Sequence, residues 1–187
     1  MLSYRGRTEV MVANPIAFPD FMRYLYTRFV PSQLSVAKLV SLIKIAHQFR
    51  VEWLYSVLED KVETYLNRTT PSPDSIRLVF ELFCHLHSFR NAAAVEAALR
   101  VAASNAAYLL RQPFILTCPA NILVRVLKHP SLRVATRRQL ELFLKEWMTC
   151  NYYHPDINAL ANNPDYLASV RTDPTGLSAS VVCFYAD

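Results

Sequence analysis

Residues 35–66 hold the clearest periodic pattern in the chain and read SVAKLVSLIKIAHQFRVEWLYSVLEDKVETYL. Ser35 is a favourable N-cap residue, and the apolar residues behind it recur at the spacing of one helical face. A second apolar face begins near Glu52 with the same spacing. The stretch therefore predicts two amphipathic helices. Their apolar faces are expected to hold Val36, Leu39, Val40, Ile43 and Ala46 in the first helix, and Leu54, Val57, Leu58, Val62 and Tyr65 in the second.

The residues before this stretch predict one short strand and one helix. Residues 8–13 read TEVMVA, in which two valines share a face at the period of a strand. Asn14 followed by Pro15 is a typical helix start, because Asn caps well and Pro fits the first helical position. Pro19 lacks the N–H that an internal helical residue donates, so we expect a kink or an irregular first turn there. The apolar face of this helix is expected to hold Phe18, Phe21, Met22 and Leu25.

The residues after it predict a link and then a pair of helices. Residues 67–73 are polar and contain two prolines, which is typical of a domain boundary. Ser72 and Pro73 open one helix, and Asn91 caps another whose alanine-rich stretch, 92–107, favours helix and lets a neighbouring helix approach closely. The first apolar face holds Ile76, Val79, Phe80, Phe83 and His87, and the second holds Val95, Ala98, Leu99, Ala102, Ala106 and Leu109.

Prolines delimit the part of the chain that follows. Pro113 and Pro119 bracket a loop around Cys118, and the short helix behind this loop stops at Pro130. We expect that helix to bury the four apolar residues of one face, which are Ile122, Leu123, Val126 and Leu127.

A capping box predicts the last long helix. Thr136 and Gln139 stand three residues apart, so each side chain can bond the backbone N–H at the other position. The apolar face behind them holds Leu140, Phe143, Leu144, Trp147 and Met148. From about Tyr152 the periodicity fades into a tail, and the apolar residues 181–185 are expected to form a strand.

The composition favours helices over a sheet-rich fold. The chain has only two glycines, Gly6 and Gly176, but 11 prolines, so many tight turns that require glycine are excluded. The hydrophobic fraction of 52% in 187 residues is sufficient for a buried core. We therefore expect a mainly α protein, with a short N-terminal strand and three helices followed by helices in antiparallel pairs.

The charge pattern does not favour a nucleic-acid or membrane partner. The net charge of +5 comes from scattered basic residues, whose densest cluster is Arg133, Arg137 and Arg138. A solvated surface accounts for this pattern, so we expect no nucleic-acid partner. No apolar stretch approaches the length of a bilayer crossing, and the first ten residues lack a signal-type apolar run. We therefore expect no membrane partner.

No constellation of residues in the sequence indicates an enzyme. The patterns GxSxG and HExxH and the glycine-rich phosphate loops do not occur. Cys84, His85 and His87 look like metal ligands, but on a helix His85 points away from the other two, and no second ligand pair stands at zinc spacing. The four cysteines are far apart and include no CxxC pair, which suits a reducing compartment. We expect no enzymatic activity, no metal and no cofactor.

Two short segments in the first part of the chain resemble a BTB/POZ domain. Residues 14–18, NPIAF, and residues 22–27, MRYLYT, resemble the family stretch Ser-Pro-x-x-Phe followed by Leu-Arg-Phe-Ile-Tyr-Thr-Gly. Arg28 stands where the family has the glycine, and Pro19 has no family counterpart. Residues 39–66 are similar to the last two helices of that domain.

The second part of the chain resembles a BACK domain. The resemblance rests on a helix pair, on Asn105 and Phe114, and on a closing Glu-Leu-Phe…Trp pattern at residues 141–147. It implies the C-terminal half of a BTB/POZ domain over residues 1–68, an antiparallel helical BACK domain over 72–151, and a tail over 152–187 with a terminal strand.

The resemblance implies a protein–protein interaction module, a substrate adaptor of a cullin-3 ubiquitin ligase. Cullin-3 binding in this family uses an apolar-x-Glu motif before the strand, which assigns Leu2 and Tyr4 to the partner-binding site, with Tyr4 in place of the acid. Because the first half of the BTB domain has no counterpart here, we expect the 187-residue chain alone to bind cullin-3 weakly or not at all. A homodimer is expected only with a full BTB domain. The sequence does not name the recruited substrate protein.

The alternative function is that of an oligomerising scaffold without a ligase role, from a secreted relative. The glycosylation sequon Asn67-Arg68-Thr69 and the missing acid at Tyr4 favour this alternative. The adaptor interpretation instead implies a cytoplasmic protein, with the nucleus as a second location.

Overall fold

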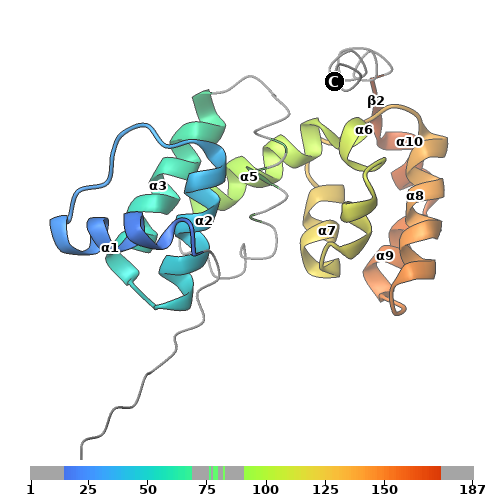
Figure 1. Ribbon diagram of the computed structural model, residues 1–187. Coiled ribbons are helices and arrows are strands. Elements are labelled where there is room, and N and C mark those ends of the chain that lie inside the picture. The colour runs from blue at the N-terminus through green and yellow to red at the C-terminus, as the bar shows by residue number, and fades with distance from the viewer. Residues whose placement is uncertain (1–14, 69–75, 77, 80–81, 83–90, 174–187) are drawn as a thin grey trace, which may run out of the picture. The chain divides into compact units, whose positions relative to one another are not determined.

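The computed structural model describes residues 15–68, 76, 78–79, 82 and 91–173 (Figure 1). The described part is mainly α, as the sequence predicts, and its only strands are β1 (Arg133–Val134) and β2 (Arg171–Thr172). The strand expected at 8–13, the Cys84–His87 cluster and the strand expected at 181–185 lie outside the described residues. The chain divides into two compact units, Met1–Lys61 (unit 1) and Val62–Asp187 (unit 2).

Helix α3 (Glu52–Arg68) crosses the division between the units. It begins where the sequence predicts a helix, and it buries three of the five residues expected on its apolar face. Leu54, Leu58 and Val62 are buried, whereas Val57 and Tyr65 are half-buried. The division falls a few residues before the expected link at 67–73, most of which lies outside the described residues.

Helix α1 (Phe18–Thr27) begins later than the sequence predicts. Residues Pro15 to Ala17 form a turn, and the Phe18 N–H donates to the Pro15 carbonyl at 3.3 Å, so the start expected at Asn14-Pro15 is wrong. Pro19 therefore stands in the first turn of α1, where a missing N–H costs no helical hydrogen bond. The irregularity expected near Pro19 lies before the helix, in the turn at residues 15–17. Phe21 and Tyr24 are the buried residues of α1.

Helix α2 (Val36–Gln48) begins as predicted, because the Ser35 hydroxyl accepts the Lys38 N–H at 3.4 Å. Four of the five expected core residues are buried, and Leu42 and Ile45 widen the buried face. The core of unit 1 combines α2 with the first turns of α3 and one face of α1, and its largest fully buried side chains are Leu42, Ile43, Ile45, Leu54 and Leu58.

The alanine-rich segment of unit 2 forms two helices instead of the single one expected. Asn91 caps α5 (Ala92–Ser104), since its side-chain oxygen accepts the N–H groups of Ala93 and Ala94 at 2.9 and 3.1 Å. Asn105 ends that helix, and its side-chain amide donates to the Val101 carbonyl at 2.8 Å before α6 (Ala106–Leu109) begins. The alanines of α5 are largely buried, and α7 packs against this helix.

The proline-bracketed segment is more regular than the loop that the sequence predicts. Pro113–Thr117 form a 3₁₀ helix (η2), and helix α7 (Ala120–Leu127) follows it. All four residues expected on the inner face of α7 are buried. Cys118, between η2 and α7, is buried.

The predicted cap of α8 (Arg137–Cys150) is confirmed with one change. The Thr136 hydroxyl accepts the Gln139 N–H at 3.1 Å. The Gln139 side chain does not bond the Thr136 N–H; its oxygen accepts the Ala135 N–H at 3.0 Å, and its amide donates to the Ala107 carbonyl at 2.9 Å. Gln139 therefore joins the start of α8 to α6. Behind it, Leu140, Phe143, Leu144 and Trp147 are buried.

Two short helices occupy the region where the periodicity fades. α9 (Pro155–Ala161) packs against α7 and α8, and α10 (Pro164–Ser169) packs against α8 and α9. The Tyr166 hydroxyl of α10 donates to the Leu127 carbonyl at 2.9 Å, and burial raises the pKa of this tyrosine to about 12. β2 then pairs in parallel with β1. These residues are thus part of unit 2 and not an irregular tail.

Candidate protein-binding surface

The predicted partner-binding residues, Leu2 and Tyr4, lie outside the described residues. The described part of unit 1 instead exposes aromatic side chains at the end of α1. Tyr26 is 79% exposed and Phe29 is 67% exposed, although both are large and apolar. Isolated apolar residues on a surface are ordinary, but a group of them held in place marks an interaction site.

The backbone around these two residues is fixed by the end of α1. Arg28 adopts a left-handed conformation, with φ 56° and ψ 14°, and its N–H donates to the Tyr24 carbonyl at 2.9 Å. This is a helix C-terminus of the kind that glycine usually provides. The Thr27 hydroxyl donates to the Arg23 carbonyl at 2.8 Å and accepts the Phe29 N–H at 3.3 Å. Phe29 therefore leaves the helix in a defined direction.

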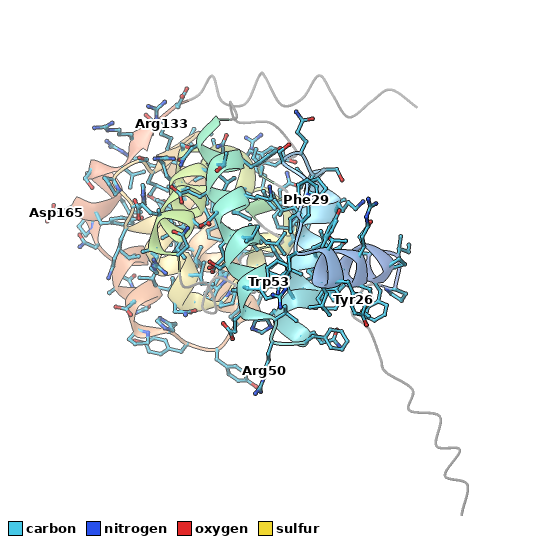
Figure 2. All side chains as sticks on the ribbon, turned by 90° about the vertical axis from the view of Figure 1, so that its left-hand side faces the viewer. Tyr26, Phe29, Arg50, Trp53, Arg133 and Asp165 are labelled. Carbon is cyan, nitrogen blue, oxygen red and sulfur yellow. The ribbon has the colours of Figure 1, made fainter. Side chains whose placement is uncertain are left out.

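A cation–π contact joins this helix end to α3. The Arg28 guanidinium carbon lies 4.5 Å from the ring centroid of Trp53, which is half-buried in the first turn of α3. Such a contact is worth about 0.5–1 kcal/mol at an exposed site. Figure 2 shows Tyr26, Phe29 and Trp53 on the face of unit 1 that carries α1. We call Tyr26, Arg28, Phe29 and Trp53 the aromatic surface.

The other end of α1 is held against α2 by stacked rings. The ring centroids of Phe21 and Phe49 lie 5.5 Å apart, and Phe18 lies 5.8 Å from Phe21 and 6.0 Å from Phe49. Ring pairs at such separations attract beyond the area that they bury. Lys38 and Asp20 add an ion pair at 2.6 Å between the two helices, and this hydrogen bond raises the pKa of Lys38. The aromatic surface therefore stands on a fixed helix.

The aromatic surface consists of residue types that are common at protein interfaces. Aromatic residues and arginine are enriched at protein interfaces, where they dominate the binding free energy. Among the residues that the structure describes, no group of three or more His, Cys, Asp or Glu side chains is placed to hold a metal ion. In the same residues, no helix combines the length and apolarity that a bilayer crossing requires.

Comparisons with known proteins found no match. No protein-family model matches the sequence, and neither a curated protein nor a solved structure matches the chain significantly. The functional argument therefore rests on the chain's own residues.

Sequence reasoning missed Tyr26 and Phe29 as site residues because it assigned most aromatic residues to helical core spacing. One signal was present. Tyr26 is off the face that Phe21 and Tyr24 share, since the angle between successive residues on a helix is about 100°. Phe29 follows the helix end and so belongs to no helical face.

Proposed function

We propose that this chain is a non-enzymatic protein-interaction module that acts as a substrate adaptor of a cullin-3 ubiquitin ligase, with the aromatic surface of unit 1 as its docking site. The observation that carries the proposal is the outward position of Tyr26 and Phe29 on a backbone that hydrogen bonds hold in place. Because hydrogen bonds already hold the backbone that carries these two side chains, a partner that buries them orders little additional backbone on binding.

The conformation of Arg28 supports the adaptor class. The resemblance to the BTB/POZ stretch places a glycine after Tyr-Thr, and this chain has Arg28 at that position. Arg28 adopts positive φ, the conformation that glycine takes most readily. The residue at this position differs from the family pattern, whereas its backbone adopts the positive φ that the glycine of the pattern would adopt readily.

A second candidate function is self-association into a scaffold without a ligase role. It is favoured by exposed apolar residues of unit 2, where Tyr152 is 97% exposed and Tyr153 is 72% exposed between α8 and α9, and Leu142 is exposed on α8. A second copy of the chain is a natural partner for such residues, because homodimer interfaces are more apolar than ordinary surfaces.

Hydrogen–deuterium exchange on the 187-residue chain, with and without the N-terminal domain of cullin-3, tests the docking site. We expect slower exchange in residues 24–30 and 52–55 when the cullin domain is present at roughly millimolar concentration, as suits a weak complex. Exchange that is unchanged throughout unit 1 would reject the proposed docking site.

Sedimentation velocity distinguishes the self-associating scaffold from the adaptor. If the chain is a self-associating scaffold, its sedimentation coefficient rises with concentration, and Tyr152→Ser/Tyr153→Ser removes the rise. If it is an adaptor that docks through the aromatic surface, the coefficient is constant over the same range. A rise that Tyr26→Ser/Phe29→Ser removes would show that the aromatic surface binds a second copy of this chain.

A further inference from the structure

Unit 2 carries a cleft lined by arginines, which the proposed function does not use. The cleft has a volume of about 580 Å³, within the range of small-ligand sites. Its polar lining comes from α3, α5, the turn before β1, and both strands. The lining residues that matter here are Asn67, Arg100, Ser104, Ser131, Arg133 and Arg171. We call this the arginine cleft.

Two of the arginines are neighbours in the parallel strand pair. Arg133 of β1 and Arg171 of β2 are partners in the register, so their side chains leave the same face of the sheet. Like charges directly opposite each other on a sheet are destabilising. Among the described residues, the carboxylate that pairs with Arg133 is that of Asp173, and at 3.9 Å it neutralises the guanidinium only partly. An anion between the two guanidinium groups would relieve this repulsion.

The third arginine reaches the cleft from α5. Arg100 is oriented by a hydrogen bond from its guanidinium to the Asn67 side-chain oxygen, which is a neutral acceptor and leaves the charge uncompensated. Ser104 stands one turn further along the same helix and also lines the cleft. Neither Arg100 nor Arg171 forms an ion pair with any carboxylate in the described part of the chain.

The arginine side chains of the cleft indicate which class of ligand it binds. Guanidinium groups bind phosphate through paired, charge-assisted hydrogen bonds, and a phosphate monoester carries nearly two negative charges at neutral pH. Three arginines around one cavity suit such a dianion better than a single carboxylate. We propose that the arginine cleft binds a phosphorylated serine or threonine side chain presented by a protein segment.

The surroundings of the cleft disfavour a nucleic acid. A nucleic-acid backbone requires basic side chains along an extended path. Here the positive charge of Lys128 faces the Asp156 carboxylate at 3.8 Å. Arg133 and Asp165 lie on the same side of unit 2 in Figure 2, so an acidic side chain shares that side. The uncompensated charge is therefore local, as a single phosphate group requires.

Titration of the full chain with short peptides, followed by two-dimensional NMR, tests this inference. The probes are Ala-Ala-phosphoserine-Ala-Ala, its unphosphorylated form, and a single-stranded oligonucleotide of five thymidines. The test variant is Arg133→Gln/Arg171→Gln. The control, Arg111→Gln/Arg125→Gln, removes the same charge from two exposed arginines that do not line the cleft. Arg100→Gln replaces the test variant if the double variant melts at a lower temperature than the control.

We expect the phosphopeptide, and not its unphosphorylated form, to shift resonances of residues 131–133 and 171. The test variant should weaken this binding by roughly tenfold or more, because charge-assisted hydrogen bonds are lost, and the control by much less. Absence of phosphopeptide binding, or equal affinity in the test and control variants, would overturn the inference. Tighter binding of the oligonucleotide than of the phosphopeptide would overturn the choice of a protein ligand.

Discussion

The end of α1 in unit 1 and the long helix α8 in unit 2 place their aromatic residues differently. In unit 1, Tyr26 and Phe29 point outwards from a helix end that is fixed by a left-handed residue, a threonine side chain and a cation–π contact. In unit 2, the aromatic residues of the long helix α8, Phe143 and Trp147, are buried.

This difference separates exposed rings on a surface from buried rings in a core. A buried aromatic ring contributes to the stability of the unit that buries it, and its removal leaves a cavity. An exposed ring contributes little to stability and becomes useful when a partner covers it. Substitutions of the buried rings of α8 should therefore change stability, and substitutions on the aromatic surface should change binding.

The largest effect is expected from Trp147→Ala in unit 2. Trp147 is 2% exposed, so its removal should lower the free energy of unfolding by about 3–5 kcal/mol. The indole nitrogen of Trp147 has no hydrogen-bond partner in the structure, so Trp147→Phe should cost much less. Urea denaturation followed by circular dichroism measures both changes.

Leu142→Ala is the matched control on the same helix. Leu142 is 56% exposed, and its truncation should change the free energy of unfolding by less than about 0.5 kcal/mol. If Trp147→Ala and Leu142→Ala changed the free energy of unfolding equally, α8 would not bury the face described above. The contrast between exposed rings at the end of α1 and buried rings in α8 would then be wrong.

A smaller effect of opposite sign is expected at the helix ends of unit 1. Arg28 and Arg50 both have positive φ, at 56° and 52°. Arg50→Gly should therefore raise the free energy of unfolding by about 0.5–1 kcal/mol, because glycine adopts this conformation without steric cost. Arg28→Gly should be nearly neutral, because the same gain is offset by loss of the contact with Trp53. A stabilisation by Arg28→Gly as large as that by Arg50→Gly would indicate that the cation–π contact contributes nothing.

The helix positions of this chain could be predicted well wherever a cap residue precedes a periodic stretch. Ser35, Asn91 and Thr136 all accept the backbone N–H groups that their positions imply. The start of α1 was wrong because Asn14-Pro15 and Phe18-Pro19 offer two helix starts, and local pattern does not choose between them. α9 and α10 were missed because a helix of one or two turns shows too little periodicity.

A different physical reason explains why the candidate sites could not be predicted from the sequence. The sequence has two glycines, and glycine-dependent turns were therefore excluded, yet arginines take the left-handed positions at Arg28 and Arg50. The arginine cleft joins residues that are far apart in the sequence. Only Arg133 of the basic cluster lines it, because Arg100 and Arg171 are brought there by the packing of α5 and by the pairing of β1 with β2.

Isothermal titration calorimetry with the N-terminal domain of cullin-3 tests the central claim, that the aromatic surface is a protein-docking site, most directly. Three forms of the 187-residue chain are compared: the unmodified chain, Tyr26→Ser/Phe29→Ser, and the control Tyr152→Ser/Tyr153→Ser, which removes two aromatic rings of unit 2 that are even more exposed. We predict weak binding, with a Kd of roughly 10–100 μM, for the unmodified chain and the control, and a Kd at least about tenfold higher for Tyr26→Ser/Phe29→Ser. The resemblance alone leaves weak binding or none, whereas a docking site on the aromatic surface requires weak binding. No binding by the unmodified chain, or equal affinity in all three forms, would therefore contradict the account.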